Sequence, residues 1–358
     1  MDITSQREVL RIRPNCEIPQ LAGQITAALA QNGPALGFGD VRSKSVSNDI
    51  SIVVATSGST GLVKEVAFSK GALIASADAS NSFVGASIGA QWSLLLPVTH
   101  IAAVNVIIRS LQVGTAPIDL RNFDGEYPYV DFTSIVPTQL FRALNSDDRL
   151  LRHLQNAKAI LVGGAALSQS LRTQAEAAGI HVIETYGMTE TCGGCIYDGH
   201  GLDGVEFALT DSGVIKIRGA VLATSYLNSA EHFGAEDGWF FTNDLGEITD
   251  GVLRVRGRAD DVIISGGENL SLTGVEATLS VRYPDLECSA FAVNDAQWGQ
   301  AFHLAIVGEA NQTEISHYLE AALGGIAKPK GIHSVDSLPL LGIGKVDRLA
   351  LAKMVENE

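Results

Sequence analysis

The sequence predicts an α/β protein with a large N-terminal domain, residues 1–257, and a small α+β domain, residues 262–358. The large domain should hold mostly parallel sheets flanked by helices, because short apolar runs alternate with amphipathic stretches between residues 52 and 183. It should also carry a β-rich subdomain at about residues 204–257, where short strand-like runs are separated by turn residues. We place the boundary between the domains at residues 258–261.

The first elements follow from apolar spacing and from residues that end helices and strands. Residues 17–30 have the spacing of a helix, and the glycines and proline of residues 33–39 predict a loop. Ser69 and Ser168 are expected N-cap residues, and Gly179 should end the helix that Ser168 begins. Strands are expected at 52–55, 66–69, 92–97, 131–137, 159–162 and 181–183, and helices at 70–82, 102–111, 139–144, 147–155 and 168–178.

The later elements change in character from residue 204 onward. Turn residues at 211–213 and 250–251 separate strands that should pair antiparallel. These strands are expected at 205–209, 214–218, 239–242, 246–249 and 253–256. In the small domain we expect helices at 272–281 and 313–323 and strands at 289–294 and 302–308.

Composition excludes several classes of protein. Hydrophobic residues make up 46% and charged residues 18%, which excludes extensive disorder. The formal net charge of −15 argues against nucleic-acid binding and means that a few placed cations must hold any anionic substrate. The most apolar stretch, residues 94–111, is broken by polar side chains, and the N-terminus lacks a signal core. We therefore expect no membrane insertion and a cytoplasmic location.

The four cysteines, Cys16, Cys192, Cys195 and Cys288, are too few for a disulfide scaffold in 358 residues. Cys192 and Cys195 have C-x-x-C spacing, but no second Cys/His pair accompanies them, so a zinc site is not expected. A redox pair stays open and is not favoured. We expect reduced thiols that serve as small packing residues.

The segment Thr56–Lys64 combines glycines, hydroxyl side chains and a final lysine directly after a predicted strand. Such a loop can bring backbone N–H groups and a positive charge close to a polyphosphate. It is not a Walker A loop, because Gly58 and Gly61 are three residues apart, Lys64 follows Gly61 by three, and Glu65 stands where Ser or Thr should follow the lysine. Taken alone, it could equally be a plain turn. Residues 163–165 and 184–190 also follow predicted strands, where ligands of parallel sheets bind.

Four further blocks follow this loop in order. They are Glu184–Glu190, Phe241–Asp244, Gly257–Asp261 with Ser265–Glu268, and Pro339–Lys345. Together with Thr56–Lys64 they resemble the motif series of the adenylate-forming superfamily, which includes acyl-CoA synthetases, nonribosomal adenylation domains and luciferases. The resemblance covers the chain from Ile52 onward. Asn243 and Val63 depart from the usual glycine and proline, but both lie beside the functional side chains and change none of them.

The resemblance implies a role for each matching residue. Thr56, Ser57, Gly58, Ser59, Thr60, Gly61 and Lys64 would cover the β- and γ-phosphates of ATP. Gly163, Gly164, Ala165, Glu184, Thr185, Tyr186 and Gly187 would line the adenine site, with Tyr186 stacking on the base. Thr189 would contact the α-phosphate, Glu190 would hold Mg²⁺, and Asp244 and Arg258 would bind the ribose hydroxyls. Asp260 would be the hinge of a mobile small domain, and Lys345 the lysine required for adenylation.

These residue types suit a two-step ligation. ATP converts a carboxylate to an acyl-adenylate and pyrophosphate leaves, so positive charge is needed at the α-phosphate and on the leaving group. The thiol of coenzyme A then displaces AMP in the same pocket. Two reactions in one pocket explain a hinge, because the small domain can withdraw Lys345 and present another face. Singly, Asp244 would be read as a turn residue and Lys345 as a surface lysine; the ordered series favours function.

The acid is suggested by a narrower resemblance. The phosphate loop begins at Thr56, which by the family resemblance leaves out about the first hundred residues of the usual large domain. This trimmed form resembles the short actinobacterial o-succinylbenzoate–CoA ligases of menaquinone biosynthesis. That resemblance implies an acyl site formed by His100, Asn105, Arg109, Gly187 and Met188, with His100 also catalytic and Arg109 facing the aromatic carboxylate. From residue chemistry alone, Arg109 could equally form a salt bridge with Asp119 or Asp124.

Three alternatives stay open on the sequence alone. The chain could be another carboxylate–CoA ligase, an adenylation enzyme that loads a carrier protein, or an ATP-binding protein without catalysis. The intact Lys64, Glu190 and Lys345 argue against the last. Enzymes of this family often dimerise, but nothing in the sequence locates an interface.

Overall fold

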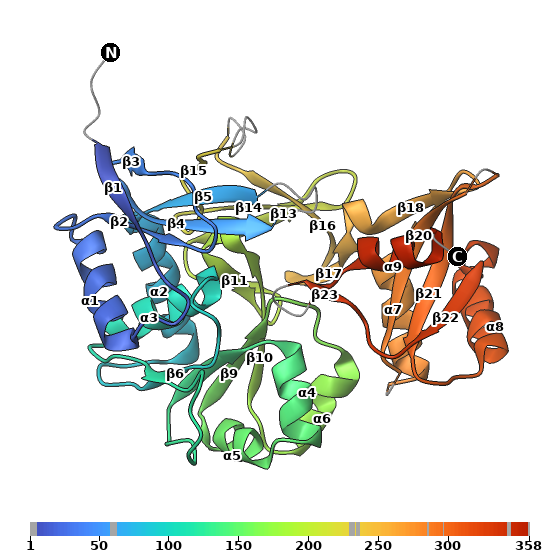
Figure 1. The fold of residues 1–358 in the computed structure, drawn as a ribbon, viewed down its shortest axis with the longest axis horizontal. Coiled ribbons are helices and arrows are strands. Elements are labelled where there is room, and N and C mark those ends of the chain that lie inside the picture. Colours follow the sequence, from blue (N-terminus) through green and yellow to red (C-terminus); the bar gives the residue numbers. More distant parts are fainter. Residues whose placement is uncertain are drawn as a thin grey trace.

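The computed structural model describes residues 6–57, 63–228, 233, 237–284, 286–295, 297–341 and 345–356. Figure 1 shows two sheets with helices between and below them, a β-rich region, and a C-terminal sheet with its own helices. The two large sheets and their helices make up the N-terminal part of the chain. No helix of the described part is long and apolar enough to cross a membrane.

The first sheet has the strand order β15-β5-β4-β2-β1-β3. Strands β1, β2 and β4 run parallel, whereas β5 turns back on β4 as a hairpin. The strands are Gln6–Arg11 (β1), Ala35–Phe38 (β2), Ser45–Ser47 (β3), Ile50–Ser57 (β4), Val63–Ser69 (β5) and Ser225–Tyr226 (β15).

The second sheet has the order β12-β11-β10-β9-β8-β6-β7. The strands from β7 to β10 run parallel, and β11 pairs antiparallel with the end of β10. They are Trp92–Leu94 (β6), Ile118–Asp119 (β7), Phe132–Ile135 (β8), Ala159–Gly163 (β9), Val182–Met188 (β10), Gly193–Tyr197 (β11) and His200–Gly201 (β12).

Alternating side chains of the second sheet build two cores. In β9, Leu161 packs into the core that the first sheet shares, whereas Ile160 and Val162 pack into the core on the other face. The shared core holds Ile18–Leu29 (α1), Lys70–Val84 (α2) and Ile101–Gln112 (α3), and the other face is covered by Pro137–Asn145 (α4), Asp148–Asn156 (α5) and Gln169–Ala177 (α6). A strand buried on both faces in this way is typical of parallel sheets.

The β-rich region is an antiparallel sheet, as predicted, with the order β13-β14-β16-β17. Its strands are Val205–Leu209 (β13), Val214–Gly219 (β14), Phe240–Thr249 (β16) and Val252–Arg258 (β17). The short helix Ala259–Asp261 (η2) follows β17 and leads into the C-terminal sheet.

The C-terminal sheet has the order β19-β18-β21-β20, with β22 paired to β21. Helices α7 and α8 pack on one face, and α9 packs on the other. The elements are Val262–Ser265 (β18), Glu268–Ser271 (β19), Leu272–Arg282 (α7), Cys288–Asp295 (β20), Gly299–Val307 (β21), Gln312–Leu323 (α8), Gly331–Val335 (β22), Leu340–Leu341 (β23), Lys345–Val346 (β24) and Arg348–Glu356 (α9). These hydrophobic clusters contain only residues from Ile263 onward.

The predicted α/β class is confirmed, and three local predictions are wrong. Residues 33–39 are not all loop, because Ala35–Phe38 form β2 and are fully buried between neighbours. Residues 184–188 continue strand β10, since β11 pairs with them beyond the end of β9. The predicted strands 239–242 and 246–249 are one strand, β16, whose register shifts between Leu245 and Gly246.

Candidate active site

The ends of β9 and β10 bring the predicted adenine contacts together. Gly163 pairs with Thr185 across these strands, and a Cβ atom on Gly163 would overlap the Thr185 hydroxyl. Gly164 has a φ of +83°, a conformation that favours glycine, and turns the chain away from the sheet. The predicted loop at residues 163–165 therefore lies beside the residues of β10 that carry the next motif.

Tyr186 and Asp244 come from different sheets and meet through a hydrogen bond. The Tyr186 hydroxyl donates to Oδ2 of Asp244 over 2.7 Å. Burial, and next the Asp244 carboxylate, raise the pKa of the Tyr186 phenol well above its ordinary value, so it stays a proton donor. The ring is partly buried, which leaves it able to pack against a planar ligand.

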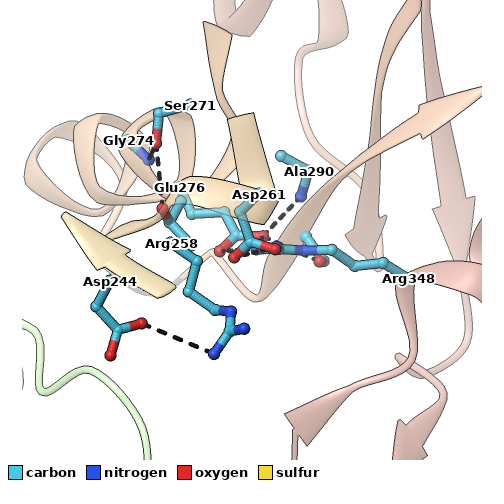
Figure 2. Close-up of polar contacts among 10 residues, drawn as sticks. Asp244, Arg258, Asp261, Ser271, Gly274, Glu276, Ala290 and Arg348 are labelled. Atoms are coloured by element: carbon cyan, nitrogen blue, oxygen red, sulfur yellow. Dashed lines mark hydrogen bonds and ion pairs between the residues drawn. The ribbon is translucent and has the colours of Figure 1, made fainter. Parts of the chain in front are cut away.

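Arg258, on β17, forms an ion pair with Asp244, as Figure 2 shows. Its Nη1 atom lies 3.7 Å from Oδ1 of Asp244, and the two residues are register partners in the β16–β17 pair. The Asp244 backbone N–H donates to the Thr242 hydroxyl over 3.0 Å, which fixes the strand at this point. Three residues assigned to the adenosine part of ATP are thus neighbours.

Glu184 faces a second charged group at the start of the same motif. Burial raises the pKa of its carboxyl, and Arg172, 4.0 Å away, opposes that rise. Arg172 is also bound to Asp198 over 2.9 Å, and the Glu184 backbone N–H donates to the Asp198 carboxylate. Arg172 of α6 and its partner Asp198 therefore fix the position of Glu184, the first residue of the motif Glu184–Glu190.

Glu190 lies in the short helix Thr189–Thr191 (η1), directly after β10. Its Oε1 atom accepts a hydrogen bond of 2.9 Å from the hydroxyl of Tyr226, a residue that the sequence did not single out. Among the described residues no three carboxylates, histidines or cysteines form a metal cluster. One carboxylate nevertheless suits Mg²⁺ that arrives with a nucleotide, since this ion usually takes one or two carboxylates together with phosphates and water.

The phosphate-loop candidate begins on β4 and ends on β5, two strands that pair antiparallel. Thr56 and Lys64 are register partners at its base, and the Lys64 ammonium lies 5.1 Å from the centre of the Tyr226 ring. Gly58, Ser59, Thr60 and Gly61, which were predicted to bind phosphate, lie outside the described residues, as does the side chain of Ser57. The placed part of the loop thus brings Lys64 close to the residue that contacts Glu190.

The predicted acyl site lies on α3 and on the strands beneath it. His100 is the N-cap of this helix, and its carbonyl accepts from the Ala103 and Val104 backbone N–H groups. The turn before it approaches β4, because a Cβ atom on Gly39 would lie 3.3 Å from the Ala55 carbonyl and 3.5 Å from that of Thr99. The histidine therefore stands close to the strand that leads into the phosphate hairpin.

Arg109 is 4% exposed and is held by neutral groups. Its guanidinium donates to the Ser134 hydroxyl over 3.3 Å and to the Tyr197 hydroxyl over 3.1 Å. Its carbon Cζ lies 5.4 Å from the centre of the Trp92 ring. Its Nε atom is buried without a hydrogen-bond partner among the described residues.

The alternative salt bridge of Arg109 is not formed. Asp119 is paired instead with Arg121 at 2.8 Å, and Asp124 makes no ion pair with Arg109 within the described part of the chain. A buried cation without a carboxylate is costly. Arg109 therefore has the environment expected of a residue that awaits an anionic ligand.

The other predicted acyl contacts also shape the β10–β11 bend. Asn105 is fully buried, and its amide donates to the Cys192 carbonyl. A Cβ atom on Gly187 would overlap the Gly193 carbonyl, so a glycine is required where the two strands approach. Met188 is joined to Thr191 by a hydrogen bond from its backbone N–H. Cys192 and Cys195 are free and fully buried, and burial raises the pKa of the Cys195 thiol to about 12, consistent with packing residues.

Lys345 and Asp260 are placed by their backbones only, since their side chains are outside the described part. Lys345 begins β24 and is the register partner of Leu341, and Asp260 lies in η2. Three residues after Lys345, Arg348 binds Asp261 at 2.7 Å and both carboxylate oxygens of Glu276 at 3.0 Å (Figure 2). Arg348 was not predicted from the sequence, where it lies in an ordinary helical pattern.

Comparisons with known proteins agree with this arrangement. A family model described as AMP-binding enzyme matches residues 8–217, more than half of the chain. The chain belongs to the AMP-binding enzyme family. The predicted superfamily is thereby confirmed.

Two relatives of this AMP-binding enzyme have names that bear on its reaction. A probable 2-succinylbenzoate–CoA ligase of Mycobacterium tuberculosis (strain CDC 1551 / Oshkosh) is 38% identical over 339 residues, covering 87% of this chain and 86% of that protein. A 2-succinylbenzoate–CoA ligase of Lactococcus lactis subsp. lactis (strain IL1403) is 30% identical over 328 residues, covering 84% and 70%. The predicted class of enzyme, an AMP-forming acid–CoA ligase, is confirmed by these relatives.

Two solved structures share the fold of the AMP-binding enzyme. The o-succinylbenzoate CoA synthetase of Bacillus subtilis, in complex with an acyl-adenylate intermediate, has a TM-score of 0.74 at 24% identity and covers 92% of this chain and 80% of that one. ATP-bound MatB of Rhodopseudomonas palustris has a TM-score of 0.79 at 21% identity, covering 97% and 83%. The roles of individual residues stay predictions.

Proposed function

We propose that the chain joins o-succinylbenzoate to coenzyme A through an acyl-adenylate, with release of AMP and pyrophosphate, as a step of menaquinone biosynthesis. The acid is the one in the names of its relatives. The observation that carries this proposal is Arg109, a guanidinium that is 4% exposed and has only hydroxyl and ring partners among the described residues.

Arg109 selects a substrate with two carboxylates. One carboxylate must reach ATP to be adenylated, so a second one is free to pair with a buried guanidinium. A bidentate Arg–carboxylate pair is stronger than a bond between neutral groups, and it offsets the desolvation of the cation. A fatty acid or an amino acid would leave Arg109 unpaired and is disfavoured.

The first half-reaction uses the residues grouped around β10. Tyr186, Asp244 and Arg258 hold the adenosine, with Asp244 positioned by the Tyr186 hydroxyl at 2.7 Å. Lys64 and Lys345 provide positive charge for the leaving pyrophosphate and for the α-phosphate. Mg²⁺, when bound at Glu190 together with the nucleotide, adds further charge stabilisation. His100, at the N-terminus of α3, lies beside the acyl group.

The second half-reaction requires Lys345 to leave. In this proposal residues 1–257 form the large domain, residues 262–358 form the small domain, and Asp260 is the hinge between them. Rotation about the hinge withdraws Lys345 and opens the adenylate to the coenzyme A thiol.

An ATP–pyrophosphate exchange assay tests the function. Exchange should depend on o-succinylbenzoate and be absent with fatty acids, with amino acids and with benzoate, which lacks the second carboxylate. Exchange with fatty or amino acids instead would refute the assignment of the acid. No exchange with any acid would refute the proposed reaction.

A further inference from the structure

The segment Ala223–Asn228 connects the two parts of the nucleotide site that lie on different sheets. At one end, the Ala223 backbone N–H donates to the Glu190 carbonyl over 2.8 Å. From there the segment runs along β5, where Ser225 and Tyr226 form the edge strand β15. It thus bridges the helix that carries Glu190 and the strand that carries Lys64.

Asn228 holds the backbone on both sides of Lys64. Its Oδ1 atom accepts from the Glu65 N–H over 2.7 Å, and its Nδ2 group donates to the Val63 carbonyl over 2.8 Å. The Leu227 N–H adds a bond of 2.9 Å to the Glu65 carbonyl. The Asn228 side-chain amide makes the hydrogen bonds that the backbone of a longer β15 would make. It thereby fixes the start of β5, next to Lys64.

Tyr226 contacts both functional side chains. Its hydroxyl donates to Glu190 Oε1 over 2.9 Å, and its ring face carries the Lys64 ammonium at 5.1 Å from the centre. Phe233 packs edge-on against the same ring with 5.4 Å between the ring centres, and Phe233 in turn stacks on Phe240 at 5.2 Å. Phe233 therefore restrains the Tyr226 ring, while the Tyr226 hydroxyl contacts Glu190 and one ring face contacts Lys64.

We propose that Tyr226 is a positioning residue of the adenylation step, which sets the Glu190 carboxylate for Mg²⁺ and keeps Lys64 beside it. This inference rests on the proposed function for the roles of Glu190 and Lys64. The hydroxyl occupies one lone pair of Oε1 and fixes the carboxylate plane, and this leaves the remaining lone pairs for the ion. The aromatic face attracts the ammonium and holds it near the site before ATP arrives.

The test is the variant Tyr226→Phe, which removes the hydroxyl and keeps the ring. We expect the Mg²⁺ concentration needed for half-maximal pyrophosphate exchange to rise about ten-fold, whereas conversion of supplied acyl-adenylate and coenzyme A to thioester stays unchanged. Tyr129→Phe is the matched control, since Tyr129 is exposed and its hydroxyl also faces a carboxylate, that of Asp131, at 3.5 Å. An unchanged Mg²⁺ requirement in Tyr226→Phe, as in the control, would overturn the proposal.

A binding measurement separates this inference from the proposed reaction. Calorimetric titration with ATP at several Mg²⁺ concentrations needs no acid, and Tyr226→Phe should weaken the Mg²⁺-dependent part of ATP affinity about ten-fold. The double variant Tyr226→Phe/Glu190→Gln should be no weaker than Glu190→Gln alone, because the hydroxyl acts through Glu190. Additive losses would overturn the inference even if the exchange assay succeeds. If wild-type protein binds MgATP but exchanges with no acid, only the proposed reaction fails.

Discussion

Arg109 shows how much one buried side chain constrains the substrate. The guanidinium is surrounded by Trp92, Ser134 and Tyr197, all without charge. A structural arginine would be expected to meet an acidic partner, and Asp119, the nearest candidate from the sequence, is already bound to Arg121. The residue environment thus favours the ligand interpretation over the salt bridge, which spacing alone could not do.

The variant Arg109→Lys should therefore raise the KM for o-succinylbenzoate about ten- to a hundred-fold, because lysine cannot form the bidentate pair. The KM for ATP should stay unchanged, since Arg109 belongs to the proposed acyl site and not to the proposed nucleotide site. Steady-state exchange kinetics measure both constants. Arg142→Lys, an exposed arginine on α4, is the control, and an equal rise of both KM values in Arg109→Lys would contradict a role in acid binding.

At the same scale, motif residues were easier to predict than their supports. Tyr186, Asp244 and Arg258 were found because they belong to ordered blocks, and the structure brings them together. Tyr226 and Arg348 were missed, because each lies in an unremarkable strand or helix pattern and acquires its contacts only by folding. Tertiary proximity of that kind leaves no local signal.

Among the elements, helices with polar caps were predicted well. Ser69 accepts from the Ala72 N–H and Ser168 from the Leu171 N–H, as N-cap residues do. The strands β2 and β11 were missed because their glycines resemble loop residues. In β11 a Cβ atom on Gly194 would lie 3.0 Å from Thr185 of β10, a close approach that a sequence without its partner strand does not reveal.

The β10–β11 bend gives a stability prediction. Gly187→Ala should destabilise the protein by about 1–3 kcal/mol, because the new Cβ meets the Gly193 carbonyl and backbone must move. Gly23→Ala in α1 is the control, since open space surrounds that position and alanine favours a helix by up to about 1 kcal/mol. Urea unfolding of both variants measures the difference, and equal stability of the two would contradict the tight approach.

The C-terminal sheet carries a pH-sensitive contact. His303 Nδ1 lies 3.0 Å from His333 Nε2, and burial, followed by His333 and Lys330, lowers the pKa of His303, which Asp295 opposes. His303 therefore binds a proton more readily in the unfolded chain than in the folded protein. Its contribution to the free energy of unfolding is fully present above about pH 6.5 and is lost as the pH falls below that value. His303→Gln should reduce this loss between pH 7.5 and 5.5 in urea unfolding. Burial also lowers the pKa of His153, so part of the pH dependence of stability should remain in the variant. If the free energy of unfolding of His303→Gln changed with pH as steeply as that of the wild type, the assignment to His303 would be wrong.

At the scale of the whole molecule, a chain of net charge −15 would bind three anionic substrates in the proposed function. The overall field repels ATP, coenzyme A and a dicarboxylate, so binding depends on a few cations at defined places. In the proposed function Lys64, Arg109 and Arg258 would be three of these, and they lie on β5, α3 and β17. Lys345 would be the fourth; it lies in the C-terminal part of the chain, and the proposed rotation at Asp260 would withdraw it.

In the proposed mechanism, Lys345 acts only if its segment moves with the small domain. Arg348 would supply that connection, because it joins the start of α9 to Asp261, next to the proposed hinge, and to Glu276 on α7 (Figure 2). We predict that Lys345→Ala abolishes adenylation yet still converts supplied acyl-adenylate and coenzyme A to thioester. Arg348→Met should show the same pattern more weakly, with adenylation reduced about ten- to a hundred-fold, since loss of one partner leaves two carboxylates without their cation.

The matched control for this prediction is Arg282→Met. Arg282 is an exposed arginine at the end of α7, and it pairs with Glu314 at 3.5 Å. It should leave both half-reactions unchanged, because an exposed pair contributes little. Rapid-quench measurement of each half-reaction separates the outcomes for the three variants. Equal loss of both half-reactions in Lys345→Ala would refute the hinge assignment, and equal loss in Arg348→Met would show that Arg348 only stabilises the fold. A selective loss of adenylation in both would instead mean that the cation that starts the reaction is positioned from the hinge side of the small domain.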